Sequence, residues 1–125
     1  MNQRDRARDL VARLIDAYNA KDADAVAALY ADDIRLWSTL GEDSRGREPV
    51  VGHIRQLFSR LPDEQMVAEV VVTDGETLVV ELTSHGTGRD GTAYEVSFTE
   101  FLWMQGNRIA GIETYIDPDE VAAIS

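Results

Sequence analysis

The sequence predicts an α+β protein in which helices cover one face of an antiparallel sheet. Apolar residues recur at helical spacing in the first half of the chain, and β-rich runs separated by short turns fill the second half. The chain has 125 residues, of which 44% are hydrophobic and 28% charged. This size and composition are typical of one globular domain, so we expect a single domain over residues 1–125.

Three helices are predicted in the first half of the chain. The first covers residues 6–19, where apolar side chains share one face of a helix. The second follows Asp22, a suitable N-cap, and carries Tyr30 on its apolar side. The third begins near Pro49, because proline is tolerated in a first turn, and ends before Pro62. These helices need a partner surface for their apolar faces.

Five strands are predicted, and four of them follow the third helix. They cover residues 34–40, 66–73, 77–87, 92–103 and 108–116. Short turns such as Asp74-Gly75 and Gly106-Asn107 join the last four, so these strands are expected to be antiparallel neighbours. A short helical turn is expected after Pro118.

Composition excludes several classes of function. The formal net charge of −11 argues against nucleic-acid binding through a basic face. No cysteine is present, which excludes disulfides and thiol chemistry, and no apolar run approaches the roughly 20 residues of a membrane span. No pair of histidines has metal-ligand spacing, and no glycine-rich phosphate loop occurs. We therefore expect a cytoplasmic protein that needs no cofactor or metal and binds neither nucleic acid nor membrane.

Three sequence phrases stand out in order along the chain: YNAKD through LYADD at residues 18–33, GRE at 46–48, and GNRI through ETYIDP at 106–118. With the order of elements, they resemble the nuclear transport factor 2-like superfamily and its SnoaL-like, ketosteroid isomerase-like branch. The resemblance implies a cystatin-like roll, in which a curved antiparallel sheet forms a cone and the three helices of the N-terminal half enclose a pocket. In many such proteins the outer sheet face pairs in a homodimer. Residues 94–103 are apolar on both strand faces, which fits a homodimer here.

Ketosteroid isomerase activity is not expected despite the resemblance. A gapless alignment places Leu14, Ser38 and Thr99 where that branch carries a tyrosine, an aspartate that acts as general base and a protonated aspartate. None of the three can perform those roles. The Asp-Arg-Asp relay of related epoxide hydrolases is also not found. A histidine pair like that of scytalone dehydratases stays open, with His53 and His85 available.

The resemblance to SnoaL-like polyketide cyclases implies a carboxylic acid or histidine in an apolar cavity that moves a proton without a cofactor. If Ser38 and Thr99 face the cavity, strand alternation places Glu95 and Trp103 there too, with Ile112 on the last strand. Glu95 is then the one inward strand carboxylate. A β-bulge would invert this assignment. The residues that it would bring inside are Glu100, Glu113 and Tyr115. We favour the first register.

The catalytic candidates are Glu95 and His53, which borders the apolar face of the third helix. Substrate contacts are expected from six further residues: Tyr18, Leu14, Ser38, Thr99, Trp103 and Ile112.

Three functions stay open. The first is a cofactor-independent isomerase, cyclase or dehydratase (a lyase) that acts on a hydrophobic organic substrate by proton transfer. The second is a protein that binds such a molecule without reaction. The third is a dimeric scaffold whose side chains fill the pocket, which an open cavity of a few hundred Å³ would contradict.

Overall fold

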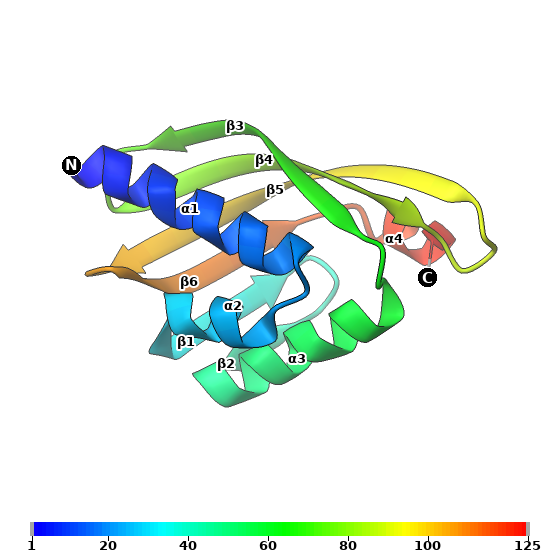
Figure 1. Ribbon diagram of the computed structural model, residues 1–125, viewed down its shortest axis with the longest axis horizontal. Coiled ribbons are helices and arrows are strands. Elements are labelled where there is room, and N and C mark those ends of the chain that lie inside the picture. The colour runs from blue at the N-terminus through cyan, green and yellow to red at the C-terminus, as the bar shows by residue number, and fades with distance from the viewer. Residues whose placement is uncertain (1, 125) are drawn as a thin grey trace.

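Helices and one curved sheet form the protein in the computed structural model, which describes residues 2–124 (Figure 1). The helices are α1 (Gln3–Asn19), α2 (Ala23–Leu29), α3 (Arg47–Arg60) and α4 (Pro118–Ile124). The strands are β1 (Tyr30–Ser38), β2 (Asp43–Arg45), β3 (Gln65–Thr73), β4 (Thr77–Thr87), β5 (Ala93–Gln105) and β6 (Arg108–Tyr115). The predicted α+β class, with three helices in the N-terminal half and a curved sheet, is confirmed.

The sheet has the order β2-β1-β6-β5-β4-β3. Strands β3 to β6 form the expected antiparallel meander. Strand β1 instead pairs with β6 in parallel, so the sheet is mixed. The parallel pair is possible because the chain between β1 and β6 contains α3 and four intervening strands, a connection far longer than a hairpin. Strand β2 lies in a segment predicted to be a loop, and its three polar residues carry no periodic signal.

Local capping explains where the helices begin. The Asp22 side chain accepts a hydrogen bond from the backbone N–H of Ala25 at 3.0 Å, as predicted for the start of α2. Gly46 precedes α3 with φ 93°, a left-handed conformation that favours glycine and turns the chain from β2 into the helix. No helix of residues 2–124 is long and apolar enough to cross a membrane.

Tyr30 lies in a strand, although it was predicted to lie in the second helix. Helix α2 ends at Leu29, and Tyr30 opens β1 with extended backbone angles. Its carbonyl accepts a hydrogen bond from Nη2 of Arg47 at 2.6 Å, and the residue is 1% exposed. Long-range contacts therefore override the helical pattern at this position.

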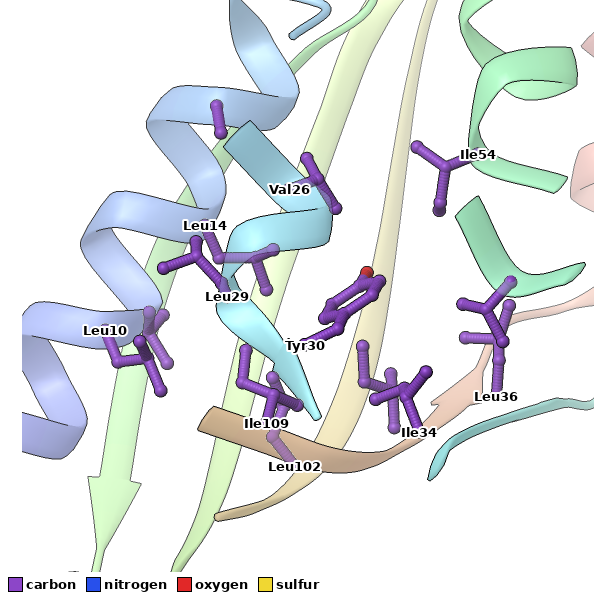
Figure 2. Close-up of a cluster of buried hydrophobic side chains, with 14 of the residues drawn as sticks. Leu10, Leu14, Val26, Leu29, Tyr30, Ile34, Leu36, Ile54, Leu102 and Ile109 are labelled. Atoms are coloured by element: carbon purple, nitrogen blue, oxygen red, sulfur yellow. The ribbon is translucent and has the colours of Figure 1, made fainter. Parts of the chain in front are cut away.

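A continuous hydrophobic core lies between the helices and the sheet (Figure 2). Leu14 and Val26 come from the helices, while Ile34 and Ile109 come from the sheet, and both of these isoleucines are 0% exposed. Figure 2 shows the hydroxyl of Tyr30 pointing away from β1, towards the space between Val26 and Ile54.

Aromatic side chains form a cluster on the outer face of the sheet. Its members are Trp37, Phe101, Trp103 and Tyr115. The Trp37 and Tyr115 ring centroids are 5.4 Å apart, and those of Phe101 and Tyr115 are 5.7 Å apart. Trp103 and Tyr115 stay 37% and 41% exposed. This outer aromatic cluster leaves substantial apolar surface uncovered.

Ile109→Ala should lower the free energy of unfolding by about 2–5 kcal/mol, because it leaves a cavity at a completely buried position. Urea denaturation followed by circular dichroism measures the change. Val72→Ala is the matched control, since Val72 is 59% exposed and its truncation should change stability by no more than about 0.5 kcal/mol. Equal effects of the two substitutions would contradict the assigned core.

Candidate active site

A cavity of about 630 Å³ lies between the helices and the inner face of the sheet. Most of its wall is apolar, with Leu14 from α1, Ile54 from α3 and Leu82, Phe98 and Ile112 from the sheet. The volume falls in the range of small-molecule sites. This open space contradicts the hypothesis of a scaffold whose side chains fill the pocket.

Glu100 on β5 is a carboxyl group in this cavity wall. Thr114 on β6 lies opposite in the antiparallel register, and its Oγ1 donates a hydrogen bond to Oε2 of Glu100 at 2.7 Å. Burial raises the pKa of Glu100 from 4.5 to about 7, the hydrogen bond from Thr114 opposes the shift, and the charge of Glu64 adds to it. At neutral pH this carboxyl group can therefore accept or release a proton.

Two phenols share the cavity with Glu100. Burial raises the pKa of Tyr30, and the charge of Glu100 raises it further. Burial also raises the pKa of Tyr18, with added contributions from Glu64, Tyr30 and Glu100 among others. The ring of Tyr18 contacts Phe58 edge-on, with centroids 4.9 Å apart. Both phenols therefore keep their protons at neutral pH and can donate hydrogen bonds.

Glu64 is a second carboxylate of the cavity wall, located between α3 and β3. It is only 7% exposed, and Oγ of Ser84 donates a hydrogen bond to its Oε2 at 2.6 Å. The ammonium group of Lys21 donates a hydrogen bond to the backbone carbonyl of Glu64. These contacts hold the polar group in an otherwise apolar wall.

His53 on α3 forms the third polar element, together with Glu42. The His53 Nε2 lies 2.7 Å from Oε2 of Glu42, and both side chains line the cavity. Glu42 follows a tight turn in which the backbone N–H of Ser38 donates to its carbonyl at 3.0 Å and Gly41 takes φ 96°. That left-handed angle favours glycine. The turn thus presents Glu42 to the helix that carries His53.

The structure places five of the eight sequence-predicted site residues on the cavity wall. They are His53, Tyr18, Leu14, Ser38 and Ile112. Their chemical roles stay predictions.

The predicted inward orientation of Glu95, Thr99 and Trp103 is wrong. None of the three lines the cavity, and the Glu95 side chain is 67% exposed and lies 3.9 Å from Nδ1 of His85 on the outside. Trp103 belongs to the outer aromatic cluster. Glu95 is therefore not a candidate for chemistry in the cavity.

The wrong orientation follows from the choice of strand face. Thr99 was expected on the cavity face with Ser38, but it lies opposite Tyr115, whereas Glu100 lies opposite Thr114 on the cavity face. Ser38 itself pairs with Thr114 in the parallel register of β1 and β6. The alternative register was right about Glu100 and wrong about Glu113 and Tyr115, which form a hydrogen bond with each other outside the cavity.

Glu64, Glu42 and Tyr30 line the cavity but were not predicted as site residues. Glu42 and Glu64 follow or precede regular elements, where acids are common on exposed surfaces, so no local pattern marks them. Tyr30 did carry a signal, because the helical pattern placed it on the apolar side of the second predicted helix. Within residues 2–124, no group of three or more His, Asp or Glu side chains is arranged to hold a metal ion.

Comparison with known proteins identifies the family. The sequence model of the SnoaL-like domain matches residues 11–112, so the chain belongs to the SnoaL-like family. Among curated proteins, none matches the chain significantly.

Solved structures share the fold over nearly the whole chain. A candidate polyketide cyclase from Xanthomonas campestris pv. campestris is 23% identical, with a TM-score of 0.88 and 98% of each chain covered. A candidate SnoaL-like polyketide cyclase from Jannaschia sp. CCS1 is 18% identical, with a TM-score of 0.85, covering 95% of this chain and 90% of that one. A candidate isomerase from Bacillus subtilis is 16% identical, with a TM-score of 0.88, covering 99% of this chain and 95% of that one. At these identities the likeness establishes the nuclear transport factor 2-like fold.

The raised pKa of Glu100 should make stability depend on pH. Between pH 4.5 and about 7, the folded state keeps a proton that the unfolded state has released, so the free energy of unfolding falls as pH rises through this window. The loss is at most about 3–4 kcal/mol, from roughly 1.4 kcal/mol per pKa unit. Glu100→Gln cannot titrate and should lack this contribution.

Urea denaturation of both proteins from pH 4.5 to 8 measures this effect. The difference in unfolding free energy between wild type and Glu100→Gln isolates the contribution of one carboxyl group from that of all other acids. A difference that stays constant across the window would show that the Glu100 pKa is not raised.

Proposed function

We propose that this chain is a cofactor-independent enzyme that transfers a proton on an apolar organic substrate, as an isomerase, cyclase or dehydratase does. The observation that carries the proposal is Glu100, a carboxyl group with a pKa of about 7 inside an apolar cavity. A general acid or base works best when its pKa lies near the working pH. The candidate cyclases and isomerase among the structural relatives add support for this class of reaction.

In the proposed reaction, Glu100 removes a proton from a carbon next to a substrate carbonyl and returns it at another position. The hydrogen bond from Thr114 fixes Oε2 of the carboxyl group and leaves the other oxygen for the substrate. The phenols of Tyr30 and Tyr18 are protonated donors in the same cavity, suited to stabilise the negative charge that develops on the carbonyl oxygen. His53, paired with Glu42, is the second acid-base group that we propose for proton delivery.

A protein that only binds an apolar molecule is the alternative, because the cavity wall is largely apolar. The two functions differ in one respect. Binding without reaction does not require a titrating carboxyl group, whereas proton transfer does.

Glu100→Gln should slow proton transfer by about 10²- to 10⁴-fold, because the amide cannot accept a proton. Exchange of α-hydrogens for deuterium in 2-tetralone and similar apolar ketones, followed by NMR in D₂O, measures the step without knowledge of the natural substrate. The wild-type rate should rise with pH through about 7, as Glu100 ionises.

Glu95→Gln is the matched control, since the same chemical change outside the cavity should leave exchange intact. Exchange that survives in Glu100→Gln would overturn the assigned base. No catalysed exchange with any ketone of the panel, together with tight binding of those ketones, would favour the binding protein.

The outer aromatic cluster supports a homodimer, as in many proteins of this fold. Trp103→Asp should shift the protein towards a monomer in analytical ultracentrifugation, because it places a charge in the exposed apolar patch. Ala12→Asp on the exposed side of α1 is the control and should leave the mass unchanged. A wild-type protein that sediments as a monomer at high concentration would contradict the dimer.

A further inference from the structure

Two arginine side chains line the cavity. Arg60 is the last residue of α3, and Arg89 follows β4 in the connection to β5. Both residues are exposed, and within residues 2–124 neither guanidinium group has a hydrogen bond or ion pair. Some other surface arginines pair with carboxylates, as in Arg35 with Asp43 and Arg55 with Asp24. The two cavity arginines are thus available to a ligand.

Both arginines belong to one rim. Oδ1 of Asp63 accepts a hydrogen bond from the backbone N–H of Thr87 at 3.2 Å, which ties the segment after α3 to the end of β4. The backbone N–H of Arg89 donates to the carbonyl of Ile124 at 3.0 Å, which ties the same connection to α4. Figure 1 shows the end of α3, the β4–β5 connection and α4 together at one end of the sheet. This rim therefore carries the guanidinium groups of Arg60 and Arg89 beside the Asp63 carboxylate, while Glu64 and Glu100 line the cavity wall.

The two rim arginines are local cations on a protein of negative net charge. With a formal net charge of −11, the protein as a whole repels anions, so attraction for an anionic group must come from local cations. Guanidinium groups bind carboxylates well, and they stay charged at every physiological pH. An acidic group inside the cavity would instead meet Glu64 and Glu100. The arrangement favours one ligand orientation, with the anion at the rim and the apolar body inside.

From this arrangement we propose that the ligand is an apolar organic acid whose carboxylate is bound by Arg60 and Arg89 at the cavity rim. The proposal rests on the proposed function, because it concerns the substrate of the same cavity. It adds a binding subsite for one chemical group, located away from the proton-transferring carboxyl group of Glu100. An organic amine is disfavoured at this subsite, since both guanidinium groups would repel it.

Two fluorescent probes separate the rim from the apolar interior. 8-Anilinonaphthalene-1-sulfonate carries an anionic group, and N-phenyl-1-naphthylamine has the same aromatic framework without it. The double substitution Arg60→Gln with Arg89→Gln should weaken binding of the anionic probe by at least about threefold, as expected for exposed charge pairs. Binding of the neutral probe should change by less than twofold. Raising the salt concentration should weaken binding of the anionic probe and leave binding of the neutral probe unchanged.

Arg6→Gln is the control, because Arg6 lies on the exposed side of α1 and does not line the cavity. It removes one positive charge from the protein and should leave both dissociation constants unchanged. If Arg6→Gln weakened binding of the anionic probe as much as the double substitution does, net charge would explain the effect and the subsite would be overturned. Unchanged binding of the anionic probe to the double variant would overturn it as well.

Displacement of the neutral probe then tests the carboxylate itself. 1-Naphthaleneacetate should displace it from the wild type at lower concentration than 1-naphthaleneacetamide, and the double variant should lose this preference. Loss of the preference with intact deuterium exchange would support the subsite. A wild type without the preference would refute the subsite while leaving the function of Glu100 in place. Failure of exchange in the ketone assay would refute the proposed function alone.

Discussion

The register between β5 and β6 decides what the cavity can do. Glu100 lies opposite Thr114, and Leu102 lies opposite Ile112, so these side chains share the inner face of the sheet. Because side chains alternate along a strand, a slip of one residue would exchange the inner and outer sets. It would place Phe101 in the cavity and Glu100 in the outer aromatic cluster. The bulge between Trp103 and Met104 lies beyond this point and leaves the parity at Glu100 intact.

Packing on the outer face supports the same register. Gly111 lies opposite Trp103, and a Cβ atom at Gly111 would stand 3.0 Å from Cε3 of the indole ring. The glycine therefore gives the ring room to lie over the neighbouring strand. On the inner face, Leu102 and Ile112 are 1% and 4% exposed. A shifted pairing would lose the fit on both faces at once.

Burial raises the pKa of both kinds of acidic group in the cavity, with a different consequence for the carboxyl group and for the phenols. For Glu100, removal from bulk water raises the pKa into the physiological range and makes the carboxyl group a proton carrier. For Tyr18 and Tyr30, the same effect raises a pKa that already lay above that range, so the phenols stay donors. One apolar enclosure thus supports both a base and the groups that can stabilise an oxyanion. Membership of the SnoaL-like family is consistent with this combination but does not name the reaction.

The sequence by itself determined the class of fold and most elements. The helical periodicity of residues 6–19 and the turns at Asp74-Gly75 and Gly106-Asn107 act locally, so they predicted α1 and the meander closely. Residues on helices with clear apolar faces, such as Leu14, Tyr18 and His53, were placed at the cavity correctly for the same reason.

Only the tertiary structure decided which strand face lines the cavity. Residues 94–103 are apolar on both faces, because one face meets the cavity and the other forms the outer aromatic cluster, so alternation gave no preferred side. The pairing of Glu100 with Thr114 resolved this, and it replaced Glu95 by Glu100. Tyr30, Glu42 and Glu64 reach the cavity through contacts between segments far apart in the chain. Local sequence carries no record of such contacts, since they depend on how the sheet curves and which strands become neighbours.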